Sequence, residues 1–172
     1  MKRYRLGLIL LTIIIGLSFT SCETDDYWKS GTLDIKFDLH PDTYDGYVQV
    51  TTIVRDVEIA EFNPSREDII DIQLNDAWLE MSNFKRGDYI ERFYIEAQGI
   101  GTFSFETPIS IRETGQIVTV DNNAYYNFMQ DVMNKLAYNK SIRITVTMYT
   151  RIYDGGPIYF DMKNNLDLRL TD

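Results

Sequence analysis

The sequence has very few of the residues on which most active sites and zinc sites depend. It holds one cysteine, Cys22, and one histidine, His40, among 172 residues. A single cysteine excludes an intramolecular disulfide, and a zinc site lacks its usual cysteine and histidine ligands. A lone histidine beside Pro41, at a predicted strand end, gives no basis for a Ser-His-Asp triad. We therefore expect a protein that is not an enzyme and that holds no metal or cofactor.

Basic residues are also scarce, since 17 lysines and arginines stand against 26 acidic residues, a formal net charge of −9. Residues 1–21 contain Lys2, Arg3 and Arg5 but no acidic residue, so a chain that begins at Cys22 has a formal charge of −12. Such a charge repels nucleic acid and anionic lipid. We expect no nucleic-acid partner.

The N-terminal 21 residues follow the order of an export signal. A basic start precedes an apolar run from Leu6 to Leu17, and small or hydroxylated residues follow up to Cys22. The run is shorter than the ~20 apolar residues that a membrane-spanning helix needs. Residues 1–21 are therefore predicted to be a signal peptide.

The segment Phe19-Thr20-Ser21-Cys22 resembles a lipobox, the cleavage motif of bacterial lipoproteins. The resemblance implies that Cys22 becomes the mature N-terminus and carries a thioether-linked lipid, although Phe19 departs from the usual leucine. The alternative is an ordinary signal peptide that leaves a free thiol. Two or more acyl chains hold a protein firmly to a bilayer, so the expected membrane contact is the lipid.

Residues 22–31 are polar and acidic and are predicted to be a tether before a domain over 32–172. Glu23, Asp25 and Asp26 resemble the short acidic signal that sends lipoproteins of the Bacteroides group to the cell surface. This resemblance implies a surface-exposed position on the outer membrane. A periplasm-facing position is the alternative, because any solvated tether is rich in charge.

Alternation of apolar and polar residues predicts strands through most of the domain. The clearest run is 141–153, and shorter runs cover 33–39, 48–54, 70–81, 93–97, 103–111, 118–120 and 158–170. The alternation changes phase near Asp56, which predicts a bulge or bend there, and it changes phase again at Asn75-Asp76. One-sided alternation favours antiparallel pairing.

One segment has helical periodicity instead, with apolar residues three and four positions apart from Tyr125 to Leu136. It predicts one amphipathic helix near residues 123–138, capped by Asp121 or Asn123 and ended by Asn139. Short strands with a single helix predict a mainly β protein, an antiparallel β-sandwich. A closed barrel remains the alternative architecture.

The order of these segments resembles small, uncharacterised surface lipoproteins of the Bacteroides group. The segments are DIIDIQLNDAWLEM, ERFYIEAQ, FSFETPISI, SIRITVTMYTRI and NLDLRL. The likeness covers most of residues 30–172 and rests on pattern rather than on a motif. It implies an immunoglobulin-like sandwich and a place in the cell envelope, and it implies no site residues.

Aromatic residues suggest the one candidate binding surface. Tyr149 and Tyr153 share a strand face with Arg143 and Arg151, opposite the apolar set. Tyrosine and arginine supply contact area with polar groups, and tyrosine rings also stack on sugars. The alternative is that the tyrosines form cross-strand pairs that stabilise the sheet.

The acidic turn that contains Asp38, Asp42 and Asp45 has carboxylates of the kind that bind calcium. Their spacing does not match an EF-hand loop, and a solvated turn in an acidic protein explains them as well. Calcium binding at this turn is left open.

These features together predict a lipid-anchored, non-enzymatic envelope protein that serves as a binding or adhesion module. Two alternatives stay open. One is a carbohydrate-binding accessory protein for nutrient capture. The other is an inhibitor or immunity lipoprotein, for which the −12 charge favours a basic protein partner.

Metabolic labelling tests the lipidation of Cys22. Cells that express the full chain and grow with labelled palmitate are expected to yield a labelled protein, because the Cys22 sulfur takes up the lipid. Its mass should lack residues 1–21. An unlabelled protein, or a mass that still includes the leader, contradicts the prediction.

Overall fold

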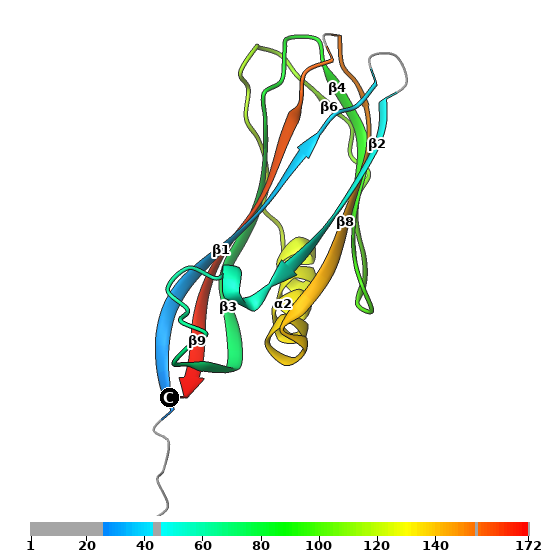
Figure 1. Cartoon of the computed structure of the whole chain (residues 1–172). Helices are drawn as coiled ribbons and strands as arrows, with labels where there is room; N and C mark the ends of the chain where they lie inside the picture. The colour runs from blue at the N-terminus through cyan, green and yellow to red at the C-terminus, as the bar shows by residue number, and fades with distance from the viewer. Residues whose placement is uncertain (1–25, 43–45, 154, 172) are drawn as a thin grey trace, which may run out of the picture.

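The computed structural model describes residues 26–42, 46–153 and 155–171, which form two antiparallel sheets packed face to face (Figure 1). In sheet A the order is β1 (Tyr27–Leu39), β9 (Ile158–Thr171), β3 (Asp68–Ser82) and β7 (Val118–Val120). In sheet B it is β2 (Gly46–Arg55), β8 (Ser141–Arg151), β4 (Tyr89–Ala97) and β5 (Gly101–Phe105), and β6 (Ile109–Ser110) also pairs with β4.

The strands pair in a nested order. β1 pairs with β9, β2 with β8, β3 with β7 and β4 with β5. The β9–β3 and β8–β4 contacts then join these pairs into sheets. This is the strand order of a jelly roll, which has eight strands, whereas an immunoglobulin constant domain has seven in sheets of four and three. The predicted antiparallel sandwich with one helix is confirmed, and its strand order is that of a jelly roll.

The predicted alternation is confirmed in the central strands. Every second residue of β8 and of β9 is buried against the opposite sheet. Both predicted phase changes also have a structural counterpart. A 3-10 helix, η1 (Asp56–Glu58), follows β2, and the β3–β9 register shifts between Leu74 and Asp76.

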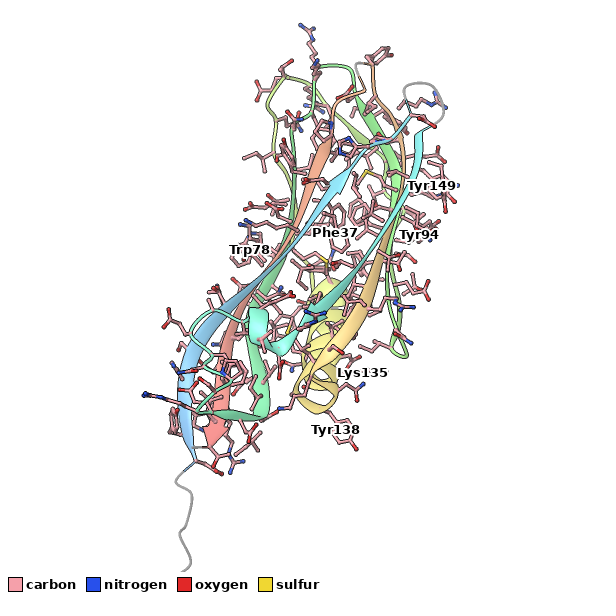
Figure 2. The ribbon with its side chains drawn as sticks, in the orientation of Figure 1. Phe37, Trp78, Tyr94, Lys135, Tyr138 and Tyr149 are labelled. Atoms are coloured by element: carbon pink, nitrogen blue, oxygen red, sulfur yellow. The ribbon has the colours of Figure 1, made fainter. Side chains whose placement is uncertain are left out.

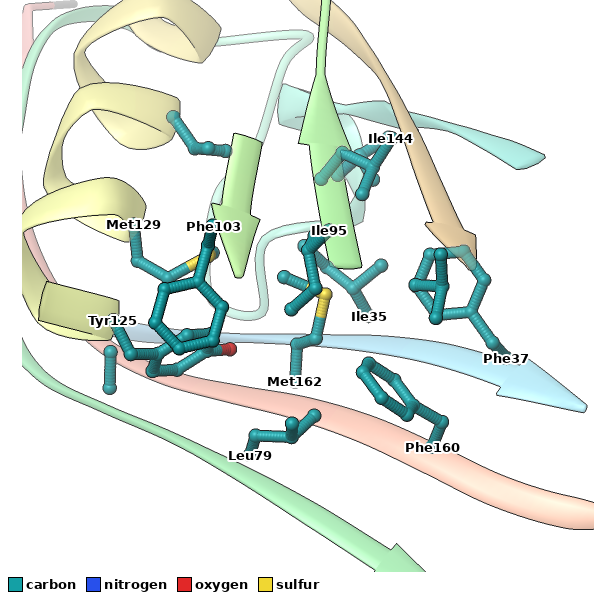
Figure 3. Packing of buried hydrophobic residues seen from close by; sticks show 14 of the residues in the cluster. Ile35, Phe37, Leu79, Ile95, Phe103, Tyr125, Met129, Ile144, Phe160 and Met162 are labelled. Carbon is teal, nitrogen blue, oxygen red and sulfur yellow. The ribbon is translucent and has the colours of Figure 1, made fainter. Parts of the chain in front are cut away.

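Aromatic rings link the two sheets at the centre of the core (Figure 3). Phe160 of β9 meets Phe37 edge-to-face at 6.1 Å and Phe93 of β4 at 5.5 Å between ring centroids. Phe93 also stacks on Phe105 at 5.0 Å. Such edge-to-face and stacked pairs contribute beyond their buried area. The aromatic contacts therefore hold the sheets in a fixed relation.

The helix α2 (Asn123–Asn139) confirms the predicted segment but has a different N-cap. Asn122, rather than Asp121 or Asn123, has the extended backbone of a cap, and its side-chain oxygen accepts from the Tyr125 backbone N–H at 2.9 Å. The helix ends as predicted at Asn139, and Lys140 follows in the left-handed conformation with φ 61°.

The helix α2 covers part of one edge of β3. β9 pairs along the other edge, and along this edge only β7 does so among the described residues. β7 pairs only with Leu79 to Met81, which leaves the earlier part of this edge open. Side chains at the helix supply hydrogen bonds there, and the partners are Tyr126 hydroxyl to Leu74 O, Leu74 N to Gln130 Oε1, Gln130 Nε2 to Ile72 O, and Lys140 Nζ to Ile69 O. The helix thus replaces a missing strand, one of the known ways of protecting a sheet edge.

The first strand begins inside the segment that was predicted as a tether. β1 starts at Tyr27, opposite Leu170 of β9, and the Tyr27 hydroxyl donates to Glu67 at 2.8 Å. The prediction of a tether over 22–31 was therefore too long, because long-range pairing recruits polar residues that show little alternation. Cys22 and the signal segment lie outside the described residues. Among the described residues, no helix is long and apolar enough to cross a bilayer.

Two neighbouring tyrosines of α2 should respond in opposite directions to loss of their hydroxyl groups. Tyr125 is fully buried, burial raises the pKa of its phenol, and its oxygen has no hydrogen-bond partner among the described residues. Tyr125→Phe should therefore raise the free energy of unfolding by about 1–2 kcal/mol. Tyr126→Phe should lower it by about 1 kcal/mol, because the hydrogen bond to Leu74 is lost.

Urea unfolding of both variants against the parent protein measures these changes. Tyr126→Phe serves as the matched control, since it makes the same chemical change on the same helix. Destabilisation by Tyr125→Phe would show that the buried hydroxyl has a partner in solution.

Candidate functional site

The outer face of sheet B carries the candidate site. Side chains alternate across a strand, so the residues between the buried positions of β2, β8 and β4 point to solvent. We call this surface the tyrosine face, and it consists of Tyr47, Gln49, Thr51, Thr145, Thr147, Tyr149, Arg92 and Tyr94.

Three tyrosines from three strands meet on this face around Tyr149. The ring of Tyr149 lies 5.3 Å from that of Tyr47 and 6.2 Å from that of Tyr94, both in edge-to-face geometry. Figure 2 shows Tyr94 and Tyr149 near each other on the outside of sheet B, with Trp78 on the opposite side of the sandwich. The Arg92 guanidinium lies 4.2 Å from the Tyr149 ring centre, within cation–π range. These contacts fix the orientation of the tyrosine rings.

A row of hydrogen bonds continues from the tyrosines along β2 and β8. The Tyr47 hydroxyl donates to Gln49 at 3.2 Å, and the Gln49 amide donates to Thr147 at 3.3 Å. Further along, the hydroxyls of Thr51 and Thr145 lie 2.9 Å apart. A hydroxyl combines one donor with two acceptor positions, so these side chains keep capacity for a ligand. The face therefore presents polar groups that are already oriented.

An open depression of about 260 Å³ lies beside Tyr149, and its lining residues are Gly46, Tyr47, Glu91, Tyr149, Thr150 and Arg151. Its shape depends on Gly46, because a Cβ there would lie 2.6 Å from the Thr150 carbonyl oxygen. The β4–β8 register shifts between Ile90 and Arg92, which makes Glu91 the extra residue of a bulge. The bulge brings an acidic group to the lining, and Arg92 is ion-paired with it.

The four residues predicted as a binding face do not form one site. Tyr149 and Arg151 both line the depression. Arg143 pairs with Ile53 near the far end of β8, six residues and roughly 20 Å from Tyr149. Tyr153 follows the end of β8 in a loop and is 76% exposed. The structure thus keeps half of the predicted set together and separates the other half from it.

Sequence reasoning missed Tyr47, Tyr94 and Arg92, which the structure adds to Tyr149. The only local signal was that each occupies an outward position of an alternating run. Their meeting depends on β2 and β4 pairing with opposite sides of β8. That pairing joins Tyr47 to Tyr149, which are 102 residues apart in the chain, and no local pattern encodes it.

The other candidate positions are scattered. His40 is exposed immediately after β1, and Asp38 is exposed on β1. Asp45 lies outside the described residues, so the structure does not test calcium binding at this turn. Within the described residues, no three histidine, cysteine or acidic side chains are grouped closely enough to hold a metal ion.

The buried Asp88 has a structural role in the loop between β3 and β4. Its carboxylate accepts from the backbone N–H of Lys85 at 2.8 Å and from that of Tyr153 at 3.2 Å. These bonds connect the β3–β4 loop to the segment after β8. A carboxylate that satisfies backbone donors in this way organises a loop.

Comparisons with known proteins give solved structures of low similarity and no sequence relative. No family model matches the chain, and no curated protein matches its sequence. The decameric capsid protein of BFDV is similar at a TM-score of 0.45 and 9% identity, over 84% of this chain and 99% of that one.

Two carbohydrate-binding modules are also among the similar solved structures. TmCBM61, solved with β-1,4-galactotriose, has a TM-score of 0.31 and 11% identity over 83% of this chain and 88% of its own. The family 11 module of Clostridium thermocellum, solved with a mixed-linked tetrasaccharide, has a TM-score of 0.28 and 14% identity over 87% and 91%. At these values the argument for function rests on the site itself.

Proposed function

We propose that the chain is a lipid-anchored, non-enzymatic binding module of the cell envelope, and that its tyrosine face binds a glycan. The observation that carries the proposal is the group of Tyr47, Tyr94 and Tyr149 on three adjacent strands. It extends the prediction of a tyrosine surface by naming the residues that stand together.

The chemistry of the face suits a sugar chain. The C–H groups of a pyranose ring pack against an aromatic ring, and Tyr47 is 51% exposed for such contact. The hydroxyls of a sugar require hydrogen-bond partners, which the side chains of Gln49 and Thr147 provide beside the rings. Apolar contact combined with a few oriented polar groups is the usual composition of a ligand site. Strands hold these groups rigidly, so binding costs little ordering.

The depression lies at the end of the domain far from the chain start. β1 runs from Tyr27 at one end of the sandwich to Leu39 at the other, thirteen residues or roughly 40 Å. The next strand returns from Gly46, which lines the depression. Figure 1 shows the described chain start beside the C-terminus at the opposite end. A lipid on Cys22 would therefore leave the depression directed away from the membrane.

The proposed location follows from the lipobox and the acidic residues after Cys22. We propose the outer membrane, with the domain on the cell surface, as in the Bacteroides-group lipoproteins that the sequence resembles. Digestion of intact cells by an added protease should remove the domain. Survival of the domain in intact cells, with digestion after lysis, would place it on the periplasmic side.

Binding of the mature domain to a glycan array, followed by calorimetry, tests the proposed ligand class. Tyr149→Ala should weaken binding roughly 30-fold, because a central aromatic contact of this kind contributes about 2 kcal/mol. Tyr47→Ala, which removes an exposed ring, should also weaken binding without loss of fold.

The matched control is Tyr159→Ala, which removes a 43% exposed tyrosine from the outer face of sheet A. It should leave binding unchanged. Absence of binding to every neutral and acidic glycan tested, or equal loss in the control, counts against a glycan ligand. A tight complex with a basic protein instead would support the inhibitor alternative.

A further inference from the structure

The sandwich has four sheet edges, and three of them are protected against strand addition. On β1 the residues Asp34, Lys36 and Asp38 place charges along the edge strand, and Thr32 forms a bridge with Ala60. A charged or covered edge resists pairing with another chain. The β7 edge is three residues long and is continued by α2. The β5 edge is short and is interrupted by Pro108 before β6.

The β2 edge has none of these protections. Its sequence GYVQVTTIVR runs for ten residues with no proline and with no charge before Arg55. β8 is its ladder partner, so the other side of the strand has no partner among the described residues. The inward-facing Val50 and Thr52 are only partly buried, which shows that nothing in the described chain fully covers this edge. A long, uncharged, β-branched strand is the kind of edge that accepts another strand.

The exposed apolar residues of β2 indicate which strand fits. Tyr47 is 51% exposed and Ile53 is 49% exposed, and they are the large exposed apolar residues of the strand. They stand three positions on either side of Val50. An antiparallel pairing of two β2 strands centred on Val50 therefore sets each Tyr47 beside Ile53 of the second copy. Aromatic and β-branched residues form favourable cross-strand pairs.

We propose that two copies of this chain associate through β2, in an antiparallel pair centred on Val50. In this register Gln49 lies opposite Thr51 of the second copy, and Val48 lies opposite Thr52. Each residue meets one that faces the same side of the sheet, as pairing requires. Arg55 lies beyond the nine paired residues from Gly46 to Val54, so no two like charges face each other. This matters because the rest of a strongly acidic chain resists self-association.

The symmetry of this pair has a consequence for the tyrosine face. The two-fold axis runs perpendicular to the sheet, so both copies direct this face to the same side. The two sheets B become one continuous sheet, with two groups of tyrosines on one surface. A ligand that spans both groups gains affinity from simultaneous contact. The association itself depends on neither the lipid nor the glycan.

Site-specific oxidation tests the register. With Cys22→Ser, the mature domain has no cysteine, so Val50→Cys introduces the sole thiol. Directly opposed residues have Cα atoms about 4.5–5.5 Å apart, within disulfide range. Val50→Cys should give a disulfide-linked dimer under mild oxidation. Thr52→Cys is the matched control, because the two copies of this residue would lie about 13 Å apart, and it should give no disulfide-linked dimer.

Sedimentation of the Cys22→Ser domain gives an independent measurement. The proposal expects reversible dimers whose proportion rises with concentration, and Thr51→Lys should abolish them by adding a charge to the edge. Thr145→Lys, on the neighbouring strand β8, should leave them intact. A monomer at every concentration, or equal crosslinking of both cysteine variants, overturns the proposal. Neither measurement uses a glycan, so this outcome leaves the proposed glycan site to its own test.

Discussion

The two central strands, β8 and β9, are the part of the molecule on which the other elements depend. β8 lies between β2 and β4, and β9 lies between β1 and β3. Both strands bury every second side chain toward the opposite sheet. Since they are consecutive in the chain, one loop connects the centres of both sheets. The outer strands then complete each sheet, and α2 closes the edge of β3 that β7 leaves open.

The candidate site follows from the same arrangement. Tyr149 lies on a central strand, so it has a neighbour on each side, Tyr47 on β2 and Tyr94 on β4. A bulge in β4 adds Glu91 to the lining, and the tight approach at Gly46 leaves space for the depression. Rigid strands and one irregularity thus produce an aromatic surface with fixed polar groups. The proposed β2 pairing would extend this surface across two copies.

Local patterns in the sequence were enough to predict most strands, the helix and both phase changes, because alternation and helical periodicity are local properties. Long-range features were out of reach. The N-cap at Asn122 depends on one backbone conformation among three neighbouring polar residues. Strand pairing decides that β1 begins at Tyr27. It also decides that Arg151 lines the depression and Arg143 does not. For the same reason the sequence predicted Tyr149 but not its neighbours Tyr47 and Tyr94, which strand pairing brings to it.

The pairing of β1 with β9 also bears on when the chain can fold. It joins Tyr27 to Leu170, so the first and last strands of the domain must meet. Such high contact order makes folding slow, since a long loop closes before its contacts form. Each sheet lacks one of its two inner strands, β8 or β9, until the last thirty or so residues are available. A chain of this design cannot complete either sheet until nearly all of the domain has been synthesised.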